Sequence, residues 1–460
     1  MKFAGEVDTF EAFEHAKLHY SIDENRVCVR GFSMGGAATW HQATHYAGEW
    51  VAATPGAGFA ETAVYQNIAA HDVQPRWWEQ KLWGLYDATS YAGNLHQCPT
   101  IAYSGENDKQ MQSSDIMAEY MAKEGLELPH IIGPGMGHAY DDESKAEIER
   151  RLVPIVEKGR DLAPKTIHFT TYTLRYNKML WVQIDALQEH WERSQVDAEI
   201  VNNTIQVTTK NITALTLDMS KGICPIQPGI KPEIQIDESS LNGDSVEAGG
   251  SWSANLVLSD DGWTIGTPAD GLRKTHGLQG PIDDAFLESF LMITPTGDPL
   301  AGKAVTEWIR DEQKDAIYQW KMQFRGDARV RLDVQVSDSD IANQNLVLWG
   351  DPRSNAVLAR IVSDLPLNWE PDGIVVGDAN HSAESCVPVL IYPNPLNLSR
   401  YVVLNSGFTF APSGSQSNAM QTPKLPDWAI LDINVSAEDR VQKGVVDCDF
   451  FNEQWDVVRR

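Results

Sequence analysis

The strongest constraint on the fold is a strand-like run that leads directly into a glycine-rich turn and a helix-forming segment. Arg26 to Arg30 (RVCVR) carries two β-branched valines and predicts a buried strand. Gly31–Gly36 (GFSMGG) follows, and the next segment, AATWHQATHY, begins with small side chains and predicts a helix. Strand, G-x-S-x-G turn and helix are the three parts of a nucleophile elbow, which lifts a serine above the edge of a sheet.

The elbow predicts a chemical role for Ser33. Flanking glycines let the strand and the helix approach without Cβ clashes, and the helix N-terminus points backbone N–H groups at a developing oxyanion. We expect the N–H of Met34 to be one of these donors. A G-x-S-x-G match is weak by itself, because glycine and serine are common in loops. The motif therefore needs an acid and a histidine further along the chain, in that order.

An acid and a histidine do follow in the required order. Pro99–Gly105 (PTIAYSG) predicts a strand, and Asp108 comes just past its end, where open α/β sheets place catalytic groups. A predicted helix, Ser113–Glu124, and a predicted strand, Leu128–Ile132, lead to a glycine-rich loop that ends in His138. The sequence thus predicts that a carboxylate and an imidazole meet at the edge of the sheet.

This order predicts a triad in which His138 accepts the Ser33 proton and Asp108 orients the imidazole ring. Glu106 and Asp115 are alternatives to Asp108, which could instead serve only as a turn or helix-capping residue. The other histidines are interpreted as surface or core residues. No H-E-x-x-H or similar ligand set occurs, so neither a metal nor a cofactor is expected.

From the elbow through GENDKQ to GMGHAY, the chain resembles the prolyl oligopeptidase-like branch of the α/β-hydrolases. The resemblance is greatest to large hydrolases of that family from bacteria of the planctomycete type. The similar segments are Lys2–Asp8, Gly31–Gly36, Pro55–Thr62 and Lys424–Ala429. It covers about residues 1–160 and extends more loosely to the end of the chain. It implies a serine peptidase or esterase, with Ser33, Asp108 and His138 at the matching motif positions.

The start of the chain departs from that pattern. Only 32 residues precede Ser33, and they contain one predicted helix, Asp8–His19. The side chains of this helix that are available to pack are Phe10, Phe13, Ala16 and Leu18. A complete hydrolase sheet has several strands before the nucleophile strand and a second oxyanion donor in an early loop. We therefore expect the nucleophile strand at a sheet edge, and the loss of one donor at a cost of about 2.7–4 kcal/mol.

We accordingly expect Met1 to be an internal methionine of a longer, N-terminally truncated protein. On that expectation the first residues do not indicate whether a signal peptide exists, and the sequence gives no localisation.

Composition narrows the classes of partner. Asp and Glu total 64 against 37 Lys and Arg, a formal charge of −27, which repels nucleic-acid phosphates and anionic membranes. No apolar stretch approaches the ~20 residues that span a bilayer. The five cysteines lie far apart without a C-x-x-C pair, as expected for free thiols. The expected partner is a small ester or peptide substrate, and the oligomeric state is not indicated.

The pattern along the chain predicts three parts. Residues 1–163 form a partial α/β-hydrolase domain. Its Trp-rich insertion, 60–97, contains Trp77 and Trp78, which either contact substrate in a lid or pack as the core of a helical cap. In residues 164–278, apolar and polar side chains alternate with a period of two, which predicts a β-rich domain. We favour structural support as its role over binding or docking.

Residues 279–460 predict an α/β accessory domain. Lys303–Phe324 is a strong helix candidate, and Asn345–Trp349 is a strand that enters a GDPRSN turn before another helix. Such a junction could receive an anion, but it lacks the glycine spacing of a nucleotide site. We therefore expect Asp351 and Ser354 simply to cap the helix.

The sequence therefore predicts an α/β fold with a partial hydrolase sheet, followed by β-rich and α/β parts. The leading hypothesis for function is a serine hydrolase that cleaves a peptide or ester bond through an acyl-enzyme. A prolyl oligopeptidase-like peptidase is favoured over a carboxylesterase. A hypothesis of another class is a non-catalytic hydrolase-fold fragment or binding scaffold. Nothing in the sequence names the scissile bond.

Overall fold

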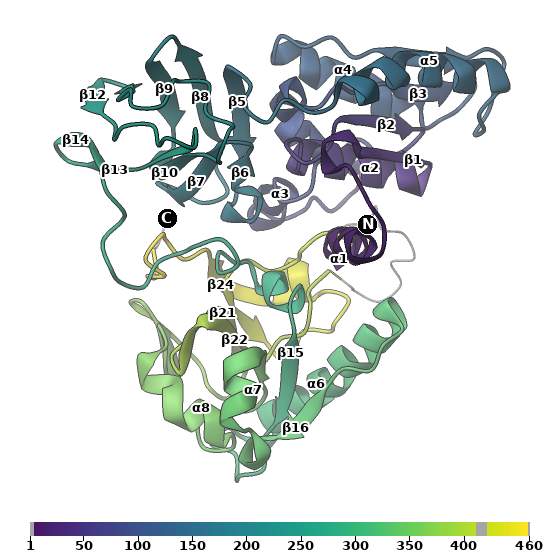
Figure 1. Ribbon diagram of the computed structural model, residues 1–460. Coiled ribbons are helices and arrows are strands. Elements are labelled where there is room, and N and C mark those ends of the chain that lie inside the picture. The colour runs from purple at the N-terminus through teal and green to yellow at the C-terminus, as the bar shows by residue number, and fades with distance from the viewer. Residues whose placement is uncertain (1–3, 411–420, 459–460) are drawn as a thin grey trace. The chain divides into compact units, whose positions relative to one another are not determined.

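The computed structural model describes residues 4–410 and 421–458 (Figure 1). Met1 and Lys2, at the start of the chain, lie outside the described residues. The chain forms two compact units, of which the first comprises Met1–His71 and Gly84–Asp270, and the second Asp72–Trp83 and Gly271–Arg460. Within the described residues, no helix combines the length and apolarity that crossing a membrane requires.

The first unit begins with a four-stranded parallel sheet in the order β1-β2-β3-β4, so that the carboxyl ends of all four strands lie at one edge. Its strands are β1 (Cys28–Phe32), β2 (Ala52–Gly56), β3 (Ala102–Gly105) and β4 (His130–Gly133). Its helices are α1 (Ala4–His19), α2 (Met34–His45), α4 (Met111–Lys123) and α5 (Asp142–Lys158). In the described part of the chain, β1 pairs only with β2, so the strand before the glycine-rich turn is at a sheet edge, as the sequence predicts.

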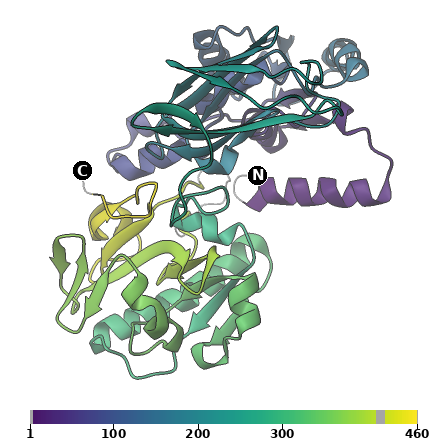
Figure 2. The ribbon, with the colours of Figure 1, turned by 60° about the vertical axis from the view of Figure 1, so that its left-hand side comes forward.

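Helix α1 begins four residues earlier than the sequence indicates and is seen along its length in Figure 2. The ring of Phe10 packs on Tyr46 at 4.6 Å and on Trp50 at 5.7 Å between ring centroids. The expectation that Leu18 packs is wrong, since its side chain is 81% exposed near the end of the helix.

The first turn of α1 is held by a buried carboxylate. Glu6 is fully buried, its Oε1 lies 2.9 Å from His45 Nδ1, and its Oε2 accepts a hydrogen bond of 2.7 Å from the Tyr176 hydroxyl. Burial acts to raise the pKa of Glu6, but the charge and hydrogen bond of His45, with Arg175 and Tyr176, outweigh it and lower the pKa. The network therefore holds an ionised carboxylate and ties α1 to α2 and to the β-rich part.

The β-rich part of the first unit is a sandwich of two five-stranded sheets, ordered β12-β11-β9-β8-β5 and β14-β13-β10-β7-β6. The first contains β5 (Thr166–Thr171), β8 (Ser194–Val201), β9 (Thr204–Lys210), β11 (Glu233–Ile236) and β12 (Ser239–Asn242). The second contains β6 (Lys178–Met179), β7 (Val182–Leu187), β10 (Ile212–Met219), β13 (Trp252–Ser259) and β14 (Gly262–Ile265). All pairs are antiparallel except β9 with β11, and a turn at Asn202, with φ of 56°, joins β8 to β9.

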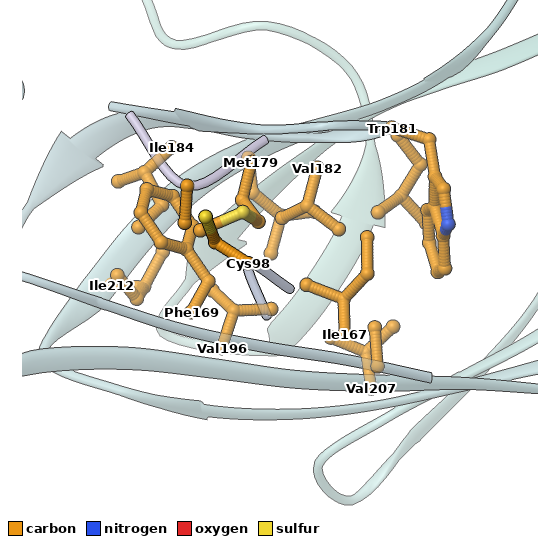
Figure 3. Close-up of a cluster of buried hydrophobic side chains, with 14 of the residues drawn as sticks. Cys98, Ile167, Phe169, Met179, Trp181, Val182, Ile184, Val196, Val207 and Ile212 are labelled. Atoms are coloured by element: carbon orange, nitrogen blue, oxygen red, sulfur yellow. The ribbon is translucent and has the colours of Figure 1, made fainter. Parts of the chain in front are cut away.

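The core of this sandwich also receives side chains from the hydrolase part. Figure 3 shows Phe169 and Val196 of one sheet facing Met179 and Ile184 of the other, with the Cys98 thiol between them. This shared core explains why the two parts form a single compact unit.

Buried polar contacts join the same two parts. The Asn94 side chain donates to the carbonyls of Thr44 at 2.9 Å and Thr170 at 3.0 Å, and it accepts from the Thr170 N–H at 2.7 Å. Because Asn94 is fully buried, losing these bonds would leave backbone groups unsatisfied. These contacts favour structural support as the role of the β-rich part.

The second unit is built on a seven-stranded sheet in the order β16-β15-β17-β22-β21-β23-β24. Its strands are β15 (Phe290–Thr294), β16 (Val330–Leu332), β17 (Asn345–Leu348), β21 (Cys386–Asn394), β22 (Asn397–Leu404), β23 (Trp428–Asp432) and β24 (Val445–Asp449). Neighbours among β16, β15, β17 and β22 are parallel, and the remaining pairs are antiparallel. A small sheet is formed by β18 (Asn368–Glu370), β19 (Gly373–Val376) and β20 (Ala379–His381).

Helices cover both faces of the parallel half of this sheet. They are α6 (Lys303–Phe324), α7 (Asp338–Asn343) and α8 (Ala356–Ile361). Helix α6 lies on one side of β15, and α7 and α8 lie on the other (Figure 1), as right-handed crossovers in both directions require. Helix α6 has the bounds that the sequence predicts, because its amphipathic pattern runs unbroken over six turns.

Candidate active site

Ser33 occupies the sharp turn between β1 and α2. Its φ of 60° and ψ of −119° lie in a region that residues with a side chain rarely adopt. The Ser33 N–H donates a hydrogen bond of 2.8 Å to the Gly56 carbonyl at the end of β2, which fixes the turn to the neighbouring strand. The strained backbone and its anchor agree with the nucleophile elbow that the sequence predicts.

Two glycines permit this turn by close approach. A Cβ on Gly31 would lie 2.2 Å from the Gly35 carbonyl oxygen, and one on Gly36 would lie 2.1 Å from the Gly56 carbonyl oxygen. Both obstacles are backbone atoms, which cannot rotate away as a flexible side chain can. The glycines therefore set how closely α2 packs on β1 and β2.

The side chains of Ser33, His138 and Asp108 form a continuous path of hydrogen-bond contacts. His138 Nε2 lies 2.7 Å from Ser33 Oγ, and His138 Nδ1 lies 2.8 Å from Asp108 Oδ2. An ionised carboxylate only accepts, so Nδ1 carries the proton and donates, which leaves the Nε2 lone pair to accept the serine hydroxyl proton. The Asp108 side chain is 4% exposed, and its other oxygen accepts from the Gln110 N–H at 2.9 Å.

The two loops that carry the acid and the histidine are joined to each other. Glu106 Oε2 accepts a hydrogen bond of 2.6 Å from the Gly135 N–H, and the Asn107 N–H donates to the Met136 carbonyl at 2.8 Å. Glu106, an alternative acid in the sequence, therefore braces the histidine loop. The other alternative, Asp115, is exposed on α4. Of the three acids, Asp108 is the one that contacts the imidazole.

Aromatic rings pack next to the His138 imidazole. The Phe32 ring lies 4.8 Å from the rings of both His138 and Tyr140, and Tyr140 stacks on Tyr103 at 4.3 Å. The Tyr103 hydroxyl donates to the Ala139 carbonyl at 2.7 Å. Burial raises the pKa of Tyr103 and of Tyr140, so both rings stay neutral. The sequence does not indicate these contacts, although Tyr140 follows the histidine by two residues.

Met34, the expected oxyanion donor, is the first residue of α2. Its N–H stands at a helix N-terminus, where the first amides have no partner inside the helix. Met34 is 52% exposed. Its backbone N–H directly follows Ser33, as an oxyanion donor in such an elbow does.

The structure assigns Trp77 and Trp78, in α3 (Trp77–Trp83), to the second unit. Trp78 is 2% exposed, and its Nε1–H donates to the Lys424 carbonyl at 3.0 Å. Trp77 is 41% exposed and meets the rings of Trp78 and Phe450 edge-on. These contacts favour the packed-core alternative for Trp78, and substrate binding by either ring stays a prediction.

A metal site does not arise from the described residues, since no group of three or more His, Cys, Asp or Glu side chains is placed to hold an ion. All five cysteines are free. The site as described consists of a hydroxyl, an imidazole and a carboxylate, with backbone amides beside them.

Comparison with known proteins shows what the first part of the chain is similar to. Residues 5–153, about a third of the chain, match the family model described as Prolyl oligopeptidase family. The match confirms the predicted resemblance to the prolyl oligopeptidase family and the α/β-hydrolase fold for this segment. No curated protein matched the chain.

Solved structures show low similarity to about a third of the chain. An S-formylglutathione hydrolase (FrmB) of Staphylococcus aureus is 19% identical over 32% of this chain and 61% of its own, with a TM-score of 0.23. SOBER1 of Arabidopsis thaliana is 15% identical over 33% and 62%, with a TM-score of 0.23. An S-formylglutathione hydrolase of Agrobacterium tumefaciens is 17% identical over 32% and 54%, with a TM-score of 0.25. The chain thus spans about three fifths of each of the first two structures and 54% of the third.

Proposed function

We propose that this chain is a serine hydrolase that cleaves a peptide or ester bond through an acyl-enzyme, with Ser33 as nucleophile. The observation that carries the proposal is the path from Ser33 Oγ through His138 to Asp108, with both contacts under 3 Å. Such a path activates a hydroxyl that is otherwise a weak nucleophile at neutral pH.

In the first half-reaction, Ser33 Oγ attacks the substrate carbonyl carbon while His138 Nε2 takes the hydroxyl proton. The resulting imidazolium is stabilised by the Asp108 carboxylate, and the Met34 N–H donates to the new oxyanion. His138 then gives its proton to the leaving amine or alcohol, and the acyl group remains on Ser33. In the second half-reaction, water takes the place of the leaving group and releases the acid.

The family match favours a peptide bond as the substrate, because the matching model describes prolyl oligopeptidases. The same residues would also hydrolyse an ester, whose alcohol is a better leaving group than an amine. The His138 side chain is 43% exposed, which suits a small, activated ester and keeps a carboxylesterase as the second candidate.

An activity-based probe tests the proposal. We expect a fluorophosphonate to label the purified chain, the label to disappear in Ser33→Ala, and the label to persist in Ser21→Ala, where an exposed serine is removed. A folded wild-type chain that stays unlabelled would instead support the non-catalytic scaffold.

The bond class is tested with two chromogenic substrates, a proline-containing peptide p-nitroanilide and p-nitrophenyl butyrate. A peptidase hydrolyses both, and Ser33→Ala loses both activities. Ester hydrolysis alone, still lost in Ser33→Ala, would identify a carboxylesterase.

A further inference from the structure

In the parallel half of the sheet in the second unit, the order in which successive strands are added reverses at β15. From β15 the chain crosses through α6 to β16 on one side, and then through α7 to β17 on the other side of β15. The loops that follow β15 and β17 therefore leave neighbouring strands toward opposite faces. In open α/β sheets, ligands bind beyond the carboxyl ends of the strands at such a switch point.

A cavity of about 270 Å³ lies at this place. Its walls come from the loop after β15, the loop after β17, and one face of the first half of α6. Pro295 and Pro299 of the first loop and Ile309 of α6 line the cavity, so part of its wall is apolar. The volume is just below the ~300–1,000 Å³ typical of drug-sized ligands and suits a molecule of amino-acid size.

Asp351 fixes the two loops around the cavity. Its carboxylate is buried, and Oδ2 accepts from the N–H groups of Leu300 at 2.8 Å and Ala301 at 3.1 Å. Oδ1 accepts from the N–H groups of Arg353 at 3.0 Å and Ser354 at 2.9 Å. One carboxylate thus satisfies four backbone amides from both loops, and the cavity wall is formed before any ligand arrives.

The expectation that Asp351 and Ser354 cap the next helix is therefore wrong. Asn355 is the N-cap of α8, and its Oδ1 accepts from the N–H groups of Val357 and Leu358 at 3.0 and 3.1 Å. Because Asp351 already accepts from these four loop amides, they are not free to bind a phosphate. The cavity is accordingly unsuited to a nucleotide.

The polar groups that remain lie mainly on α6. Gln313 is 6% exposed, and its Nε2 donates to Thr294 Oγ1 at 2.7 Å, so its carbonyl oxygen is left to accept from a ligand. Among the described residues that line the cavity, Arg310 is the one cation. Its ion pair with Asp311, at 3.2 Å, joins two exposed side chains and holds the guanidinium weakly.

We propose that this cavity binds a small organic carboxylate. The carboxylate pairs with the Arg310 guanidinium in the first half of α6. The Thr294 hydroxyl donates a hydrogen bond to the ligand, the Gln313 carbonyl accepts one from any hydroxyl or amino group that the ligand carries, and the apolar body of the ligand lies against Ile309 and the two prolines. The Asp351 carboxylate on the wall is already bound by four backbone amides, so the Arg310 guanidinium is the charge that pairs with a ligand, and the ligand carries one negative charge.

Calorimetric titration of the full chain tests this site, with benzoate and hexanoate as probes and benzamide and hexanamide as neutral controls. We expect at least one carboxylate to bind, and its amide to bind at least tenfold more weakly. Arg310→Gln should weaken the carboxylate at least tenfold. Lys321→Gln, which removes a charge from an exposed position of the same helix outside the cavity, should leave binding unchanged.

The proposal is overturned if neither carboxylate binds, if inorganic phosphate binds more tightly than both, or if Arg310→Gln and Lys321→Gln bind the carboxylate equally. Arg310 is exposed, so the fold should tolerate its replacement, and circular dichroism checks this. Fluorophosphonate labelling of Ser33 in the same variants reports on the proposed hydrolase separately, because the cavity lies wholly in the second unit.

Discussion

Gly35 and Gly36 are adjacent in the elbow, yet the structure predicts opposite effects when each is changed to alanine. A Cβ on Gly36 would lie 2.1 Å from the Gly56 carbonyl oxygen, whereas a Cβ on Gly35 would have no atom within 4 Å. Both positions are in the first turn of α2. Comparing the two variants therefore distinguishes a requirement for close packing at Gly36 from a general preference for glycine in this turn.

The size of the effect follows from the distance. Cβ contacts essentially never fall below 3.0 Å, so in Gly36→Ala helix α2 and strand β2 must separate by about 0.9 Å. Such overpacking costs about 1–3 kcal/mol of the free energy of unfolding. The shift also displaces Ser33, whose N–H is bonded to Gly56, and a misplacement near 1 Å costs roughly 100-fold in rate. Gly35→Ala should instead stabilise the helix by up to about 1 kcal/mol.

Urea unfolding and the rate of fluorophosphonate labelling measure the two effects. We expect Gly36→Ala to unfold at lower urea and to label roughly 100-fold more slowly, while Gly35→Ala unfolds at the same or higher urea and labels at a rate near that of the wild type. Equal behaviour of the two variants in both assays would refute the close approach of α2 to β2.

Three further outcomes are expected. Asp108→Asn should lower kcat by about 10⁴-fold, because His138 loses the acceptor that keeps its proton on Nδ1; a fall of less than tenfold in the substrate assays would contradict this role. The lowered pKa of Glu6 means that its pairing with His45 stabilises the fold fully above pH 4.5, the ordinary pKa, and less as the pH falls below it. Glu6→Gln should therefore cost roughly 1–3 kcal/mol in urea unfolding at pH 7 and less at pH 3.5, and an equal loss at both would argue against a buried anion. Burial raises the pKa of Cys98 to about 12, so iodoacetamide at pH 8 should modify this thiol in urea but leave it intact in the native chain; modification of native Cys98, detected by mass spectrometry, would place it outside the core.

The elements that the sequence predicts well are those with a strong local pattern. The bounds of α6 follow from its unbroken amphipathic period, and the elbow follows from glycine spacing between a strand and a helix. Ser33, Asp108 and His138 could also be recognised from local sequence patterns, because each residue comes just after a predicted strand. The hydrogen bonds between them could then be expected from the rule that parallel strands end at one edge.

Contacts between segments that lie far apart in the sequence have no such local pattern. The sequence does not indicate that Cys98 enters the core of the sandwich or that the insertion carrying Trp77 belongs with the second unit, since an apolar side chain looks the same whichever core buries it. Capping at Asn355 was missed for a related reason. The carboxylate of Asp351, which the sequence predicts to cap the helix, instead bonds amides about 50 residues earlier in the chain.

In the proposed mechanism, Ser33 carries the acyl group during turnover. Rapid acid quenching of the chain with p-nitrophenyl butyrate, followed by peptide mass spectrometry, measures this directly. We expect a butyryl group on the peptide that contains Ser33, formed in a burst equal to the enzyme concentration or less and absent in Ser33→Ala. Turnover that persists in Ser33→Ala, or an acyl group found on another residue, would contradict it.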